Sequence, residues 1–179
     1  MRFASMRNLD ISNGEGVGVS LFVQGCDRHC FNCFNPDTWD FNGGKEWTEE
    51  TKNKFIKLID RPYINRISVL GGEPLAEQNL DEVLSLIKEI RISFPEKTIW
   101  LYTGYKFEDL INGIHYPLDS EWEDKILRQS IVKLCDVLVD GEYIDEQKDI
   151  SLRFRGSKNQ RVIDVKQSLA QNKVVLYCN

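Results

Sequence analysis

Short, continuously apolar segments alternate with amphipathic segments along this chain, and this alternation limits the fold more than any other feature. The clearest amphipathic segment carries apolar residues at helical spacing from Leu80 to Ile90, and Pro95 follows its end. Apolar strands of this kind are buried on both faces, which is typical of a parallel sheet covered by helices. The sequence therefore predicts an α/β domain with a mainly parallel sheet.

The expected elements can be placed along the chain from their patterns. Thr48 and Asn79 are expected to cap two helices, and Trp122, Ile126 and Ile131 are expected to face the core from a third. Right-handed crossovers would curl the sheet toward a barrel, but 179 residues are too few for a full barrel of about 250. We expect an incomplete, open barrel with strands at 17–23, 66–70, 98–102, 136–139, 161–165 and 174–177, and helices at 49–60, from 80, at 106–111 and at 121–134.

Length and composition predict one domain over 1–179, in which 166–179 is a C-terminal extension without an interpretable motif. The net charge of −5 gives no general reason to expect nucleic acid as a partner. No apolar stretch approaches the roughly 18–20 residues of a membrane span. Three of the five cysteines lie within eight residues, which argues against a secreted disulfide framework and for a reducing cytoplasm.

Cys26, Cys30 and Cys33 form a C-x₃-C-x₂-C run directly after the first expected strand. Three thiolates at this spacing can hold three corners of a [4Fe–4S] cluster and leave the fourth iron without a protein ligand. An open metal position invites a substrate or cofactor, so this run predicts chemistry more than scaffolding.

A zinc site is the structural alternative, and it needs a fourth ligand. His29 adjoins a cysteine and is poorly placed to supply one. Cys135 or Cys178 could do so only if the fold brought it near the loop, and the simpler interpretation of both is a buried thiol.

Unusual motifs follow three further expected strands. They are Gly71-Gly72-Glu73-Pro74, Thr103-Gly104-Tyr105 and Asp140-Gly141-Glu142-Tyr143. The carboxyl ends of parallel strands meet at one edge of a sheet, so these motifs and the cysteine loop are expected to converge. Beside the cysteines, the glycine pair favours close approach of a ligand to the backbone, with Glu73 accepting from an ammonium group.

The cysteine run together with Gly-Gly-Glu-Pro resembles the radical S-adenosylmethionine superfamily. Within it, the chain resembles the family of activating proteins of anaerobic ribonucleoside-triphosphate reductases over about residues 7–165. The blocks that carry this narrower resemblance are Asn13-Gly-Glu-Gly16, Phe34-Asn-Pro-Asp-Thr-Trp39, Trp100-Leu-Tyr-Thr-Gly-Tyr105, Val139-Asp-Gly-Glu-Tyr143 and Arg155-Gly-Ser-Lys-Asn-Gln-Arg161.

The resemblance implies two cofactors, a [4Fe–4S] cluster with one open iron and S-adenosyl-L-methionine chelated to that iron. One electron, supplied by a flavodoxin or ferredoxin, would cleave the C5′–S bond and give methionine and a 5′-deoxyadenosyl radical. That radical would abstract hydrogen from a glycine in the radical loop of the reductase catalytic subunit. A slot left by the incomplete barrel would admit the loop.

The resemblance also implies roles for individual residues. Cys26, Cys30 and Cys33 would be the catalytic cluster ligands. The segment Asn32–Phe34 would contact the adenine side of the cofactor, with Phe31 or Phe34 stacking because Asn32 stands where an aromatic is often found. The remaining implied contacts are Gly72 and Glu73 to the methionine amine, Thr103 and Asp140 as polar contacts, and Arg155 and Asn159 to cofactor or partner, unless the last two are structural.

Other functions stay open at this point. The chain could activate another glycyl-radical enzyme, such as one of the pyruvate formate-lyase type, or could be a small radical enzyme acting on a free heterocycle. A different class of function is a non-catalytic iron–sulfur carrier or zinc module, although a carrier normally completes its cluster with four protein ligands.

Overall fold

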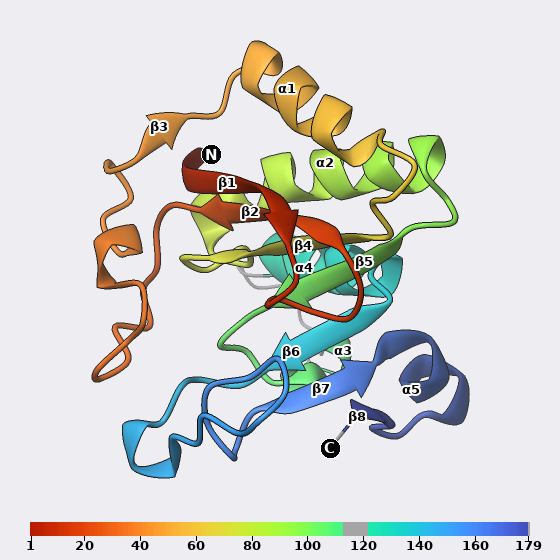
Figure 1. The fold of residues 1–179 in the computed structure, drawn as a ribbon. Helices are drawn as coiled ribbons and strands as arrows, with labels where there is room; N and C mark the ends of the chain where they lie inside the picture. Colours follow the sequence, from red (N-terminus) through yellow and green to blue (C-terminus); the bar gives the residue numbers. More distant parts are fainter. Residues whose placement is uncertain (113–121, 179) are drawn as a thin grey trace.

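A mixed sheet runs through the described part of the chain, residues 1–112 and 122–178 of this computed structural model (Figure 1). The strands are β1 (Arg2–Asp10), β2 (Gly18–Val23), β3 (Lys45–Glu46), β4 (Arg66–Gly71), β5 (Thr98–Tyr102), β6 (Val137–Asp140), β7 (Arg161–Asp164) and β8 (Leu176–Cys178). The helices are α1 (Glu49–Ile59), α2 (Leu80–Ser93), α3 (Phe107–Asn112), α4 (Trp122–Leu134) and α5 (Val165–Gln171), with short 3₁₀ turns at Pro36–Thr38, Glu77–Asn79 and Asp145–Gln147.

The strand order is β3-β1-β2-β4-β5-β6-β7-β8, so the expected α/β class and the open sheet are confirmed. The four central strands β2, β4, β5 and β6 are parallel, whereas β1 and β3 on one side and β7 and β8 on the other pair antiparallel. The expectation of a mainly parallel sheet therefore holds only for its centre. The chain returns from β1 to β2 and from β6 to β7 without a crossover helix, and such connections produce antiparallel neighbours.

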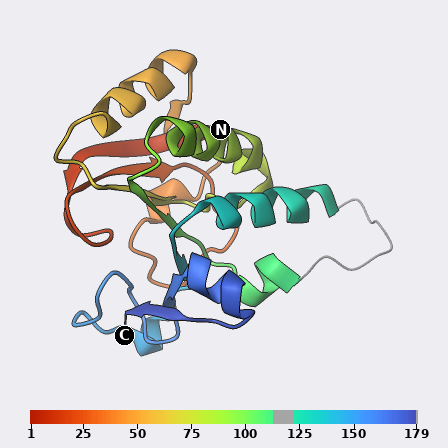
Figure 2. The ribbon, with the colours of Figure 1, turned by 90° about the vertical axis from the view of Figure 1, so that its right-hand side faces the viewer.

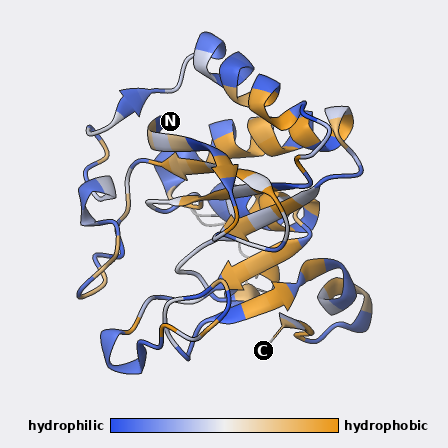
Figure 3. Ribbon diagram, in the orientation of Figure 1, coloured by the Kyte–Doolittle hydropathy of each residue, from blue (hydrophilic) through white to orange (hydrophobic). Residues whose placement is uncertain are grey.

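Helices α1, α2 and α4 cover one face of the sheet (Figure 2). The core between them is built from alternate residues of the central strands and from the apolar stripe of each helix. Figure 3 shows apolar colouring on the central strands and on the helix sides that meet them. The continuously apolar strands are thus explained by burial on both faces.

The other face of the sheet contains buried polar groups beside a second apolar cluster, which is formed by Trp100, Val137, Val139 and Val162. Arg66 is fully buried, and its Nη2 donates to the main-chain oxygen of Asp10 at 2.6 Å and to its carboxylate at 3.4 Å. Gly14, in the β1–β2 connection, lies against Arg66 and Trp100 so closely that a Cβ there would meet them at 2.6 and 2.7 Å. This connection therefore covers the amino-terminal half of that face.

The two predicted helix caps had different outcomes. Thr48 caps α1 as predicted, because its side chain accepts from the N–H of Thr51 at 3.2 Å. Asn79 precedes α2 but makes no cap with its side chain. Its amide instead donates to the main-chain oxygens of Gln24 at 3.1 Å and Glu73 at 3.0 Å, where it is buried. The prediction of an Asn79 cap was wrong because these buried carbonyls require a donor.

One further expectation is corrected by the structure. Ile126 is 36% exposed on α4, whereas Ile131 is buried as predicted. The helical spacing predicts Ile126 on the buried side of α4. It is partly exposed because only the carboxyl-terminal end of α4 contributes fully buried residues. Strand β1 was not predicted. Glu121, the expected first residue of α4, lies outside the described residues.

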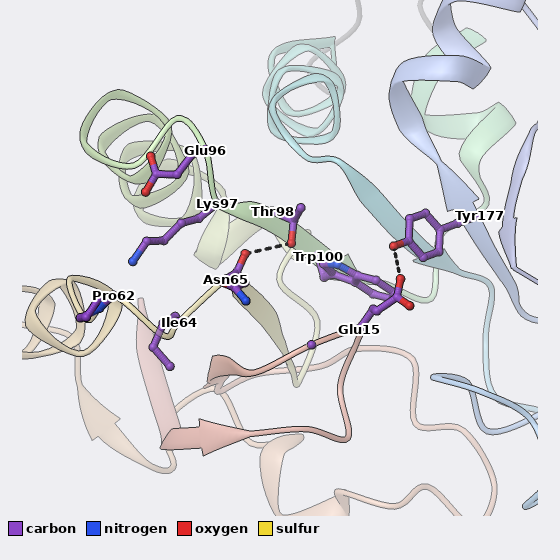
Figure 4. Close-up of a pocket in the computed structure, with 10 residues that line it drawn as sticks. Glu15, Pro62, Ile64, Asn65, Glu96, Lys97, Thr98, Trp100 and Tyr177 are labelled. Atoms are coloured by element: carbon purple, nitrogen blue, oxygen red, sulfur yellow. Dashed lines mark hydrogen bonds between the residues drawn. The ribbon is translucent and has the colours of Figure 1, made fainter.

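The predicted C-terminal extension completes the sheet. It forms α5, which Asp164 caps by accepting from the N–H of Gln167 at 2.9 Å, and then β8. Tyr177 packs edge-on against Trp100, with ring centroids 5.2 Å apart, and its hydroxyl hydrogen-bonds with Glu15. Figure 4 shows this contact beside a cavity of about 420 Å³ at the amino-terminal ends of β4 and β5, at the end of the sheet opposite the strand-end motifs.

No helix in the two described ranges has both the length and the apolar character needed to cross a lipid bilayer.

Candidate functional site

A cavity of about 430 Å³ lies at the carboxyl ends of the four central strands. Residues of all the strand-end motifs line it, so the predicted convergence is observed. From these motifs the lining comprises Cys26, Cys30, Cys33, Gly71, Gly72, Glu73, Thr103, Gly104, Gly141, Glu142 and Tyr143.

The cysteine loop leaves β2 through a tightly bonded turn. Gly25 has φ +95°, which favours glycine, and its N–H donates to the carbonyl of Thr38 at 2.8 Å. The N–H of Cys26 donates to the carbonyl of Trp39 at 3.1 Å, and the side-chain amide of Gln24 donates to the carbonyl of Asp40 at 2.8 Å. The two ends of the loop are therefore held together before any metal binds.

The three thiols suit a site for a cluster that is loaded after folding. Burial raises the pKa of Cys26 to about 11 and also raises that of Cys30. Metal binding to such thiols must release their protons. The Sγ of Cys33 already accepts from the N–H of Asn35 at 3.4 Å. Soft thiolate donors of this kind fit an iron–sulfur group.

The structure supplies no fourth protein ligand for zinc from the residues considered above. Cys135 is buried among helix and sheet residues, with its thiol against the carbonyl of Ile131 at 3.2 Å, and Cys178 packs with the second apolar cluster. Neither cysteine lines the cavity, and nor does His29. Within the described ranges, no three His, Cys, Asp or Glu side chains are gathered closely enough for one metal ion. A [4Fe–4S] cluster binds each thiolate at a different iron, so its cysteines need not lie as close together as the ligands of a single metal ion.

Gly72 and Glu73 form the wall facing the cysteine loop. A Cβ at Gly72 would lie 2.3 Å from the carbonyl oxygen of Gly25, so the two turns are in backbone contact. Glu73 is 1% exposed, and its carboxylate accepts from the N–H of Leu75 at 2.9 Å, the hydroxyl of Thr103 at 2.8 Å and the N–H of Gly104 at 2.8 Å. Burial raises the pKa of Glu73, against the effect of these donors. A carboxylate has about four acceptor positions, so one stays available.

Thr103 and Asp140 are both engaged by other residues. The Thr103 hydroxyl donates to Glu73 and accepts from the N–H of Tyr105 at 3.1 Å, which fixes Glu73. Asp140 is buried and is not among the residues that line the cavity. Its carboxylate accepts from the N–H of Phe107 at 2.9 Å and from Arg161 Nε at 3.0 Å. The structure thus places Asp140 beneath the site, where it holds α3 and β7.

The residues around the third cysteine are exposed. Asn32, at φ +54°, does not line the cavity, because its side-chain amide donates to Asp145 at 2.9 Å. Phe31 is 73% exposed and is also outside the lining. Phe34 does line it and meets Tyr143 edge-on, with ring centroids 5.3 Å apart. Of the two aromatics considered for stacking, only Phe34 is in the lining.

Arg28 is a site residue that the sequence reasoning missed. It lies between two cysteines, lines the cavity, and places its guanidinium 3.9 Å from the ring centroid of Tyr105. Its Nη1 donates to Glu142 at 3.0 Å. A spacer position between metal ligands carries no pattern of its own, so no local signal could have identified it. Arg155 also lines the cavity, as suggested, whereas Asn159 donates to the carbonyl of Glu142 at 2.7 Å.

Comparison with known proteins agrees with this geometry. A family model described as a 4Fe-4S single cluster domain matches residues 12–163. The chain is 37% identical over 164 residues to the anaerobic ribonucleoside-triphosphate reductase-activating protein of Salmonella typhimurium, covering 90% of this chain and 97% of that protein, and the same figures hold for the protein of that name from Escherichia coli. The Vibrio cholerae protein of that name is 35% identical over 162 residues, covering 89% and 96%. The chain therefore belongs to the family of anaerobic ribonucleoside-triphosphate reductase-activating proteins, which carry a [4Fe–4S] cluster domain.

Proposed function

We propose that this chain reductively cleaves S-adenosyl-L-methionine and uses the resulting 5′-deoxyadenosyl radical to form a glycyl radical on the catalytic subunit of anaerobic ribonucleoside-triphosphate reductase. The observation that carries the proposal is the meeting of Cys26, Cys30 and Cys33 with Gly72 and Glu73 in one cavity. The reductant would be a flavodoxin or ferredoxin. We place this chemistry in the cytoplasm, where the cysteines stay reduced.

The [4Fe–4S] cluster, when bound by the three cysteines, would supply the electron and an iron position free for the cofactor. Glu73 would accept from the ammonium group of the cofactor through its remaining acceptor position, and Thr103 would hold Glu73 in place. The apolar side chains of Phe34, Leu70 and Phe154 also line the cavity and would exclude water from the reacting atoms.

We infer that a polypeptide substrate enters the cavity between two connections. Ser12 and Asn13 of the β1–β2 connection line one side of it, and Leu152 and Arg155 of the β6–β7 connection line another. These connections belong to different parts of an open sheet and are not joined by a further strand, although Arg153 of one and Glu15 of the other form an exposed ion pair at 3.9 Å. A loop of a second protein would enter between them, so the partner would complete the enclosure.

Electron paramagnetic resonance tests this proposal. The reconstituted, reduced protein is mixed with S-adenosyl-L-methionine and the reductase subunit, and a glycyl radical signal and 5′-deoxyadenosine are expected. Cys30→Ala should abolish both, whereas Cys135→Ala, a matched change at a cysteine away from the cavity, should retain both. A glycyl signal on pyruvate formate-lyase but not on the reductase would assign the chain a different partner. Full turnover by the Cys30 variant would remove the cluster assignment.

A further inference from the structure

The β6–β7 connection, residues 141–160, contacts the cysteine loop at side chains that lie between or beside the three cysteines. Arg28 bonds to Glu142 at 3.0 Å, and Asn32 bonds to Asp145 at 2.9 Å. The ring of Phe34 meets the ring of Tyr143, and Lys148 Nζ lies 5.2 Å from the ring centroid of Phe34. We name this set of contacts the clasp.

The clasp attaches the middle of the cysteine loop to another wall of the cavity through side chains. Inside the loop, a main-chain hydrogen bond joins the N–H of Cys33 to the carbonyl of Cys30 at 3.1 Å, and it spans only one turn. Both ends of the loop are fixed at Gly25 and Thr38, but its middle contacts the β6–β7 connection through Arg28, Asn32 and Phe34. The position of the thiols therefore depends on a connection more than 100 residues further along the chain.

The Arg28–Glu142 pair places two opposite charges beside the thiols. Their side chains are 23% and 51% exposed, and both line the cavity together with the three cysteines. A cation next to a cluster stabilises its reduced, more negative form, and an anion destabilises that form. Arg28 is further fixed by its stacking on Tyr105, so its charge is held at the cavity wall.

We propose that Arg28 and Glu142 are positioning residues that act with opposite sign on the reduction potential of the cluster while together fastening the cysteine loop. The proposal rests on the proposed function only in assuming that a cluster binds to the three cysteines. Neither residue is required to touch the cofactor or the substrate. Only the cluster would gain and lose the electron, so no bond is made or broken at either residue.

The test uses Arg28→Gln, Glu142→Gln and the double variant of the full chain. The control is Glu50→Gln, which breaks a comparable pair with Lys54 (2.8 Å) on the exposed face of α1. After anaerobic reconstitution, iron and sulfide per chain are measured, followed by the midpoint potential in a redox titration monitored by electron paramagnetic resonance. Arg28→Gln should make the potential more negative and Glu142→Gln less negative. The double variant should lie between them, and the control should match the wild type.

Hydrogen exchange of the metal-free chain tests the fastening separately. Each single variant should exchange amides 27–35 about two- to fivefold faster, and the double variant no faster than the single ones, because one pair is lost in each case. The electrostatic role would be overturned if the midpoint potential shifted in the same direction in both single variants. It would also be overturned if the potential shifted in neither variant. Unchanged exchange would overturn the clasp. A wild-type chain that binds no cluster would instead refute the proposed function, and the exchange result would still decide the fastening.

Discussion

The contact between Gly72 and Gly25 gives a sharp test of how the site is built. A methyl group at Gly72 would lie 2.3 Å from the carbonyl oxygen of Gly25 and 2.9 Å from its carbonyl carbon. Both are backbone atoms and cannot turn aside as a side chain could. To reach an ordinary contact, the carbonyl must retreat by about 1 Å, which breaks the 2.7 Å bond from the N–H of Glu73.

Overpacking of this kind costs about 1–3 kcal/mol. The lost hydrogen bond adds about 0.5–1.5 kcal/mol. Gly72→Ala should therefore lower the free energy of unfolding by about 2–4 kcal/mol. For a chain of this size each kcal/mol shifts the melting temperature by about 2–4 °C, so thermal unfolding followed by circular dichroism should show a fall of about 4–16 °C.

Gly141→Ala is the matched control. Gly141 has φ +93°, but a Cβ there would meet its nearest neighbour at 3.7 Å, so only backbone strain opposes the change. That strain is about 1–2 kcal/mol. The reasoning fails if Gly72→Ala melts within 2 °C of the wild type. It also fails if the Gly141 variant is the less stable of the two.

Three further perturbations test other parts of the structure. Glu73→Gln should weaken S-adenosyl-L-methionine binding by roughly tenfold or more at unchanged iron content, because a hydrogen bond to a charged group is worth about 1.5–3 kcal/mol; equal affinities by equilibrium binding would exclude Glu73 from the cofactor site. Arg66→Met should cost about 1–3 kcal/mol in urea unfolding, because it removes the buried donor to the main-chain oxygen of Asp10, while Arg7 still pairs with the Asp10 carboxylate; a loss below about 0.5 kcal/mol would contradict this. The hydrogen bonds from Arg161 lower the pKa of Glu108 to about 2, from 4.5, so the pair stabilises the fold above pH 4.5 and this stability is lost as pH falls through 2. Unfolding free energies of Glu108→Gln and wild type should therefore differ at pH 7 and converge toward pH 2, and a constant difference would refute the assignment.

The central strands were predictable because their burial is recorded in their composition. β4 and β5 are mostly apolar, and their predicted bounds agree with the structure to within one residue. β1 was missed because its side chains alternate irregularly between exposed and buried, with polar residues such as Asn8 within it and two interruptions in its register with β2. β7 and β8 were predicted as strands, at 161–165 and 174–177, but their antiparallel direction was missed because it depends on how the connections return.

The site was predictable as far as it follows from strand order. Motifs after parallel strands must meet at one edge, and residues from each of these motifs line the cavity. What could not be predicted is which side chains pair within that edge. Asp140 stands at a strand end like Glu73, but Arg161 and the start of α3 engage it beneath the site. Arg28 pairs with Glu142, which lies 114 residues further along the chain, and no local sequence pattern indicates a partner at that separation.

That separation also has a consequence for synthesis of the protein. At about 5–20 residues per second, the cysteine loop is made roughly 6 to 23 s before the connection that carries Glu142. During this interval β6, β7 and β8 do not exist, so one wall of the cavity is missing and the three thiols stand in open solvent. Insertion of iron and sulfide is therefore expected to follow release of the chain from the ribosome, and a reducing environment matters most for this protein while it is still being translated.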